Sequence, residues 1–202
     1  MTCALVAIDP ALRRTGAAVY SFDTDPSTGR AMPGTALLLL ATSDTRRAVD
    51  QFEALSHEIE QTIGVGVQWC AVIEKPTPRG GGTPPTAAYR FWCEEAERWA
   101  RARAEAAGVR YRRPRILTPM ASQWRGPLGI ATRAPVRGGK LEDRRLVLKQ
   151  QAVAYAQKHL KAGVLDADAA EAVCLGAWAL RCLALGVAPS GRGRFKEIHY
   201  VA

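Results

Sequence analysis

At 202 residues and 48% hydrophobic composition, the chain is long enough to bury one sizeable core and has the usual length of a single domain. Lys and Arg number 28 against 19 Asp and Glu, and the resulting formal charge of +9 attracts polyanions such as nucleic acid or an anionic membrane surface. The five cysteines are widely spaced and form no CxxC pair, so neither a disulfide framework nor a zinc site is encoded. The N-terminal apolar run lacks the features of a signal peptide, and no apolar stretch reaches bilayer length. We therefore expect a soluble, cytoplasmic protein.

The first third of the chain is predicted to form three strands and a helix. Apolar, β-prone runs cover residues 3–8, 16–22 and 36–41, and the basic turn after the first run favours a hairpin. From Asp44 to Ile63, apolar residues recur at helical spacing, and Asp44 can cap the first turn.

The remaining two thirds are predicted to be mainly helical. The Pro- and Gly-rich residues 75–85 predict a loop, and 126–139 predict a flexible basic segment. The expected elements are a strand over 67–73, a helix over 86–107, a short strand over 109–111, and helices over 141–160 and 167–185. This order indicates an α/β domain with a mixed sheet flanked by helices.

Four carboxylates stand where strands end or a helix starts. Asp9 follows the first predicted strand and Glu74 the fourth, while Asp168 and Glu171 lie three residues apart on one helix face. Small alanines around the last pair would let that helix approach the sheet. Carboxylates gathered in this way repel one another unless cations neutralise them, and hard oxygen ligands favour Mg²⁺ or Mn²⁺.

Each acid also has a purely structural interpretation. Asp9 can belong to a turn before Pro10, Glu74 can be a surface acid beside Lys75, and Asp168 with Glu171 can cap a helix. Asp166 directly precedes the helical pattern and fits the cap position better than Asp168 does. The joint arrangement of the four acids favours a metal site over four unrelated caps and turns.

The acids lie in three motifs that resemble those of the RuvC family of Holliday-junction resolvases. Residues 7–16 (AIDPALRRTG) look like the family's first-strand motif, residues 72–76 (VIEKP) resemble its fourth-strand acid, and residues 168–172 (DAAEA) resemble its C-terminal acid pair. The three motifs occur in the family's order. The stretch 123–125 (QWR) is similar to phage-encoded members in particular.

The resemblance implies an RNase H-like fold with a mixed five-stranded sheet flanked by helices. It places the nuclease domain at 1–188 and leaves 189–202 as a basic tail. It implies a structure-selective endonuclease that resolves Holliday junctions by paired symmetric nicks in DNA recombination and repair, in a bacterial or phage-infected cell. Asp9, Glu74, Asp168 and Glu171 would then hold Mg²⁺ or Mn²⁺ as two ions per site, with Asp9 bridging them.

Basic residues around the predicted site are candidates for DNA contacts. Lys140 and Lys149 would come nearest to the reacting phosphate, because the family has lysines in this region. Any single one of these cations can equally belong to a solvated basic face. The full set is Arg13, Arg14, Lys75, Arg79, Arg125, Arg133, Arg137, Lys140, Arg144, Arg145 and Lys149.

The family's junction wedge, an aromatic residue after the second acid, is absent from residues 75–79 (KPTPR). Tyr89, Phe91 or Trp92 could replace it by stacking on bases, although aromatics at the start of an amphipathic helix more often belong to the core. Paired cutting of a two-fold junction implies a homodimer, with the apolar side of the helix over 86–107 as a candidate interface.

Other functions remain open at this point. The acids are compatible with an RNase H-like nuclease that acts on other branched DNA or on RNA–DNA hybrids, and the basic residues alone are compatible with a non-catalytic DNA-binding module. An ATP-binding protein of the actin and sugar-kinase type would need further Gly-rich phosphate loops, and residues 79–83 lack the P-loop lysine. A Ser/His/Asp hydrolase is disfavoured because none of the three histidines lies near a nucleophile motif.

Overall fold

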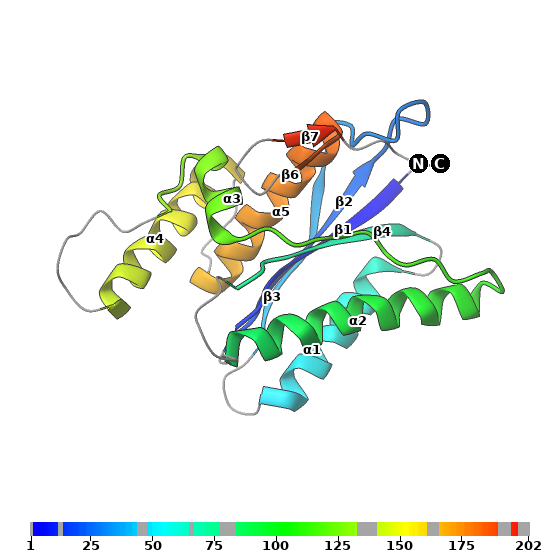
Figure 1. Cartoon of the computed structure of the whole chain (residues 1–202), viewed down its shortest axis with the longest axis horizontal. Coiled ribbons are helices and arrows are strands. Elements are labelled where there is room, and N and C mark those ends of the chain that lie inside the picture. The colour runs from blue at the N-terminus through cyan, green and yellow to red at the C-terminus, as the bar shows by residue number, and fades with distance from the viewer. Residues whose placement is uncertain are drawn as a thin grey trace.

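The computed structural model describes residues 2–11, 14–43, 48–64, 67–76, 84–132, 141–160, 166–189 and 195–197. Its centre is a five-stranded sheet in the order β3-β2-β1-β4-β5 (Figure 1). The strands are β1 (Thr2–Asp9), β2 (Gly16–Asp23), β3 (Ala36–Thr42), β4 (Gln68–Ile73) and β5 (Ile116–Leu117). The first three strands are antiparallel neighbours, whereas β4 runs parallel to both β1 and β5. The sheet is therefore mixed, as expected.

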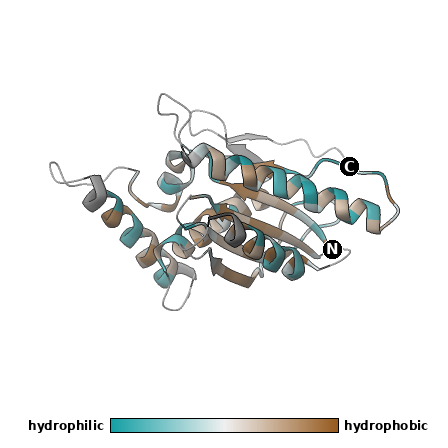
Figure 2. Cartoon of the chain, turned by 90° about the horizontal axis from the view of Figure 1, so that it is seen from below, coloured by the Kyte–Doolittle hydropathy of each residue, from teal (hydrophilic) through white to brown (hydrophobic). Residues whose placement is uncertain are grey.

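Helices cover both faces of the sheet (Figure 1). One face carries α1 (Ala48–Ile63) and α2 (Pro84–Ala106), and the other carries α3 (Ala121–Arg125), α4 (Leu141–Leu160) and α5 (Ala167–Leu185). A 3₁₀ turn over Gly126–Leu128 follows α3, and a small ribbon pairs β6 (Val187–Pro189) with β7 (Phe195–Glu197). Figure 2 shows the hydrophobic strands enclosed between helices with mixed surfaces.

The central strand divides its side chains between two cores. Leu5 and Ala7 of β1 point to the core under α5, while Val6 and Ile8 point to the core under α1 and α2. This alternation follows from the two-residue period of a strand. Because helices cover both faces of the sheet, side chains on both sides of β1 are buried. This explains why the strand is a continuous apolar run in the sequence.

The expected short strand over 109–111 is wrong. The fifth strand is β5, at Ile116–Leu117, which pairs with Ala71 and Val72 of β4. Val109 is 61% exposed and lies in the turn that ends α2, where its amide donates to the Ala104 carbonyl at 2.9 Å. A β-prone triplet cannot form a strand where no partner strand lies beside it. The short helix α3 was also not anticipated from the sequence.

All five thiols are free, and four of them are buried as small core side chains. Among the described helices, none combines the length and the hydropathy needed to cross a membrane.

Candidate active site

Two of the four acids meet at one end of the sheet. Asp9 ends β1, Glu74 follows β4 immediately, and the parallel pairing of these strands brings their carboxyl ends together. The Glu74 amide donates to the Ile8 carbonyl at 3.0 Å, which extends the ladder to the acid itself. In open α/β sheets, sites gather at this end of the strands.

Helix α5 brings the other two acids to the same place. Asp166 is its N-cap, with a side chain that accepts from the Asp168 amide at 2.9 Å, which confirms the expected division of roles. The first turn of α5 packs against Gly16 at the start of β2, where a Cβ atom would collide with the Asp168 carbonyl. Glycine at this position therefore sets how closely the helix approaches the sheet.

Three carboxylates converge tightly. Oxygens of Asp9, Asp168 and Glu171 lie within 4.8 Å of one another, a spacing that could hold a metal ion. Glu74 is not part of this close group, but it lines the same cleft of about 510 Å³. One Glu74 oxygen accepts from the indole Nε1 of Trp124 at 2.6 Å. The residues lining the cleft are Asp9, Pro10, Ala11, Arg14, Glu74, Arg125, Arg145, Leu148, Lys149, Asp168 and Glu171.

Burial and mutual repulsion make ionisation of this group costly. Burial, followed by the charge of Asp168, raises the pKa of Asp9 to about 6, against the opposing effect of Lys149 and Arg125. Burial and then the charge of Asp9 raise the pKa of Glu74 to about 8, although the Trp124 hydrogen bond and Arg125 lower it. Such shifts mark a site where added positive charge is favourable.

The chain's own cations neutralise the two acids from α5. Lys149 of α4 pairs with Asp168, and Arg125 of α3 pairs with Glu171. The second pair is enclosed, since the side chains are only 9% and 7% exposed, and the guanidinium lies 4.9 Å from the Trp124 ring centre. Arg14 reaches the cap residue Asp166 at 2.9 Å. A divalent ion bound here would compete with Lys149 and Arg125 for these carboxylates.

The structure places only part of the expected DNA-contacting set. Arg14, Arg145 and Lys149 line the cleft, whereas Lys75 is exposed beside it and its backbone pairs with Met120. Arg125 also lines the cleft but is engaged with Glu171. Arg144 lies in α4. Four expected contacts, Arg13, Arg79, Arg133 and Arg137, and the proposed phosphate-binding Lys140, lie outside the described residues.

The aromatic residues of α2 belong to the core. Trp92 and Trp99 are almost completely buried, and Trp92 donates toward the Thr15 hydroxyl at 3.4 Å. Tyr89 and Phe91 are half-buried against the same core. The buried residues of α2 therefore face the sheet of their own chain, so Trp92 cannot stack on a base. The dimer interface on this helix stays a prediction.

Trp124 is a residue of the candidate site to which the sequence assigned no role. It is fully buried, yet its single polar atom is directed at Glu74, and the next residue pairs with Glu171. A tryptophan followed directly by a cation, at residues 124 and 125, is the signal in the sequence that could have indicated it. The two residues together connect α3 to two of the four acids.

No protein-family model and no curated protein sequence matches this chain. Its structure is similar to that of RuvC from Thermus thermophilus, with 12% identity and a TM-score of 0.50 over 88% of this chain and 95% of that one. The same bacterium's RuvC in complex with Holliday junction substrate gives 14% identity and a TM-score of 0.49 over 91% and 96% of the two chains. The fowlpox virus resolvase with its junction DNA gives 13% identity and a TM-score of 0.43 over 89% and 98%. The first of these likenesses, together with the strand order of the sheet, confirms the expected RNase H-like fold, as in RuvC.

Proposed function

We propose that this chain is a metal-dependent endonuclease that resolves four-way DNA junctions by paired nicks. The observation that carries the proposal is the convergence of Asp9, Asp168 and Glu171, with Glu74 beside them, at the carboxyl end of the two central parallel strands. The RuvC-like fold supports it, as does the resemblance of the motifs around these acids to those of RuvC-type resolvases.

The donor set fits a hard divalent cation. Three carboxylates offer oxygens within 4.8 Å. The raised pKa values of Asp9 and Glu74 reflect burial first and then the charge of a neighbouring carboxylate, and a cation would offset both effects. We infer that Asp9, Asp168 and Glu171 hold Mg²⁺ or Mn²⁺, with Glu74 completing a second position. Bound divalent ions supply activation of water and neutralisation of charge on the scissile phosphate.

The chain's remaining residues orient the acids and the DNA. Trp124 fixes one Glu74 oxygen through its indole N–H, which restricts the carboxylate to one direction. Arg14 and Arg145 line the same cleft, which supports a role for both in binding backbone phosphates near the cut. Lys149 pairs with Asp168, and its ammonium group would be available to the reacting phosphate if that carboxylate held a metal ion instead.

Junction selectivity and a two-fold dimer are part of the proposal. Two symmetric nicks across a junction need two active sites related by a two-fold axis, which a homodimer provides. Acids of this kind specify phosphodiester hydrolysis and not branch geometry, so flaps, forks and RNA–DNA hybrids are the alternative substrates. A DNA-binding module without catalysis is the alternative if no substrate is cut.

The test compares cleavage of a labelled four-way junction, linear duplex, flap and RNA–DNA hybrid in Mg²⁺, Mn²⁺ or EDTA. Asp9→Asn should abolish cutting and retain junction binding, while Glu94→Gln, an exposed acid of α2, should behave as wild type. Paired nicks that require metal support a resolvase. Preferential cutting of another substrate reassigns the target, and equal cutting by Asp9→Asn contradicts the proposed site.

A further inference from the structure

A second cleft lies at the opposite end of the sheet from the acids. It has a volume of about 960 Å³ and is bounded by the C-terminal ends of α1 and α2, the start of β4, and residues 107–115. From Gln68, which lines this cleft, to Glu74 the chain runs along β4, a distance of roughly 20 Å at the rise of a strand. The two clefts are thus separate sites on one molecule.

Small residues and one turn create this space. The α2 residues that face it include Ala100, Ala104 and Ala106, which leave the volume that larger side chains would fill. Gly108, with a left-handed φ of 63°, ends the helix and turns the chain back across the cleft. Trp69 contributes an aromatic wall, half-buried and held edge-on against Trp99 at 5.8 Å between ring centres.

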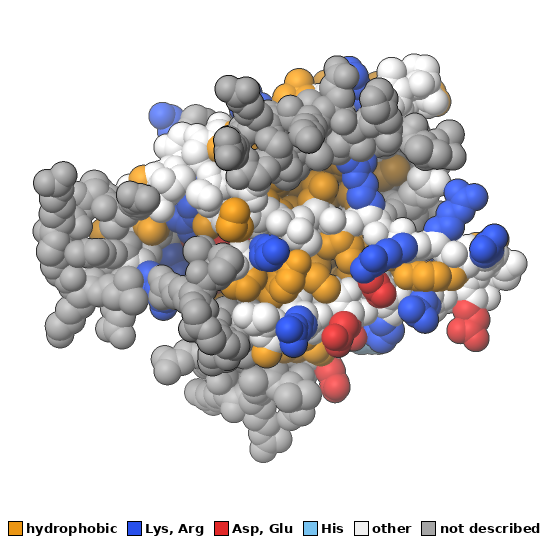
Figure 3. Space-filling view, in the orientation of Figure 1, with side chains coloured by type: hydrophobic (Ala, Val, Ile, Leu, Met, Phe, Trp, Pro, Cys, Tyr) orange, Lys and Arg blue, Asp and Glu red, His pale blue; other side chains and the backbone are white. Residues whose placement is uncertain are grey.

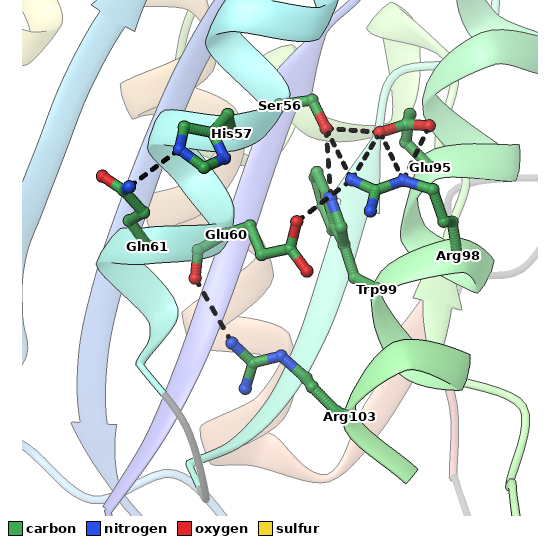
Figure 4. Close-up of polar contacts among 8 residues, drawn as sticks. All are labelled: Ser56, His57, Glu60, Gln61, Glu95, Arg98, Trp99 and Arg103. Carbon is green, nitrogen blue, oxygen red and sulfur yellow. Dashed lines mark hydrogen bonds and ion pairs between the residues drawn. The ribbon is translucent and has the colours of Figure 1, made fainter. Parts of the chain in front are cut away.

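Five arginines line the cleft, namely Arg103, Arg110, Arg112, Arg113 and Arg115, against one acid. That acid, Glu60, is already paired with Arg98 at 3.1 Å (Figure 4). Arg113 pairs with Glu97 at 2.8 Å, whereas Arg110 and Arg112 are exposed and make no ion pair with a described residue. Figure 3 shows Lys and Arg side chains gathered on the part of this face where α2 ends. The cleft therefore carries a net positive charge.

Arg103 has hydrogen-bonding capacity to spare. Its Nη2 donates to the Glu60 carbonyl of α1 at 3.4 Å (Figure 4). Its Nε and Nη1 are buried and have no partner among the described residues. Buried donors without an acceptor are costly. A rotation of the Arg103 side chain would let these donors bind an anion in the cleft, and that contact would stabilise the guanidinium.

We propose that this cleft binds an unpaired stretch of DNA, with a base stacked on Trp69 and phosphates held by Arg103, Arg110 and Arg112. An aromatic face beside guanidinium groups is the combination that single-stranded nucleic acid requires. A duplex would leave the concave apolar floor unfilled, because its bases are already stacked. The proposal rests on the proposed function, since the same DNA would extend from the acid cleft, about six base pairs away.

The test measures binding of a fluorescein-labelled oligothymidylate by anisotropy in EDTA, over a range of salt concentrations. Arg110→Ala with Arg112→Ala should lower the slope of log affinity against log salt by about 1.4, because each single-strand phosphate contact contributes about 0.7. The matched control is Arg30→Ala with Arg181→Ala, two exposed arginines outside the cleft, which should leave the slope unchanged. Trp69→Ala should weaken binding about 5- to 100-fold, and Trp69→Phe should retain most of it.

Three outcomes would overturn the inference: equal slopes for the cleft pair and the control pair, equal loss in Trp69→Phe and Trp69→Ala, or competition by polyglutamate as strong as that by unlabelled oligonucleotide. The last would indicate an acidic protein segment as the ligand. Since binding in EDTA involves no cleavage, failure here is distinguishable from failure of the nuclease proposal, which is measured with metal on the junction.

Discussion

Replacing Arg125 by methionine tests whether the chain's own cations keep the metal-free site stable. Methionine retains an unbranched apolar stem beside Trp124 but removes the charge that pairs with Glu171. Both side chains of this pair are under 10% exposed. The variant therefore leaves a buried carboxylate with no cationic partner, while the backbone of α3 is unaltered.

The expected loss is large because the pair is enclosed. Breaking a buried ion pair by removing one partner costs about 3–5 kcal/mol, since the remaining charge stays desolvated. For a chain of this length, such a loss lowers the unfolding midpoint by about 6–20 °C. Arg145→Met, an exposed cation in the same cleft, should change the free energy of unfolding by no more than about 0.5 kcal/mol.

The assay is thermal and urea unfolding at pH 8, first in EDTA and then with Mg²⁺ or Mn²⁺. Metal should stabilise Arg125→Met more than wild type, because in the variant the ion need not displace a guanidinium from Glu171. Equal stability of the variant and wild type in EDTA would refute the structural role of Arg125. An equal gain from metal in both proteins would refute competition between Arg125 and the ion.

Two further predictions concern pH and packing. The pKa values of Asp9 and Glu74 are raised from 3.8 and 4.5 to about 6 and about 8, so the folded, metal-free protein retains protons that the unfolded chain has lost. The free energy of unfolding in EDTA should therefore fall as the pH rises from about 4 to 8, while metal affinity rises over the same window. Urea midpoints and metal titrations at each pH measure the two quantities. A free energy of unfolding that does not change with pH in EDTA contradicts the prediction. Gly16→Ala should destabilise the chain by about 1–3 kcal/mol and reduce cleavage by pushing Asp168 away from Asp9, whereas Gly126→Ala, which meets no atom within 4 Å, should be close to neutral in both assays.

Much of the fold could be predicted because the signals are local. Apolar runs and helical spacing located β1 to β4, and the predicted bounds of α4 and α5 agree with the structure. The acids could be found for the same reason, since Asp9 and Glu74 stand where apolar runs end and Asp168 precedes Glu171 by one helical turn. The strand over 109–111 failed because β propensity carries no information about which partner strand is within reach.

The order of residues along the chain thus determined β1 to β4, the long helices, the positions of the four acids and the cap at Asp166. Only the tertiary structure decided which cations neutralise those acids, that Trp124 orients Glu74 across 50 residues of sequence, and that the buried residues of α2 face the sheet of their own chain. The physical reason is that the spacing of residues along the sequence fixes which of them share a face of one strand or helix. Contacts between two elements depend instead on how closely those elements pack. At Gly16, a single missing Cβ atom sets that distance for the helix that carries half of the acids.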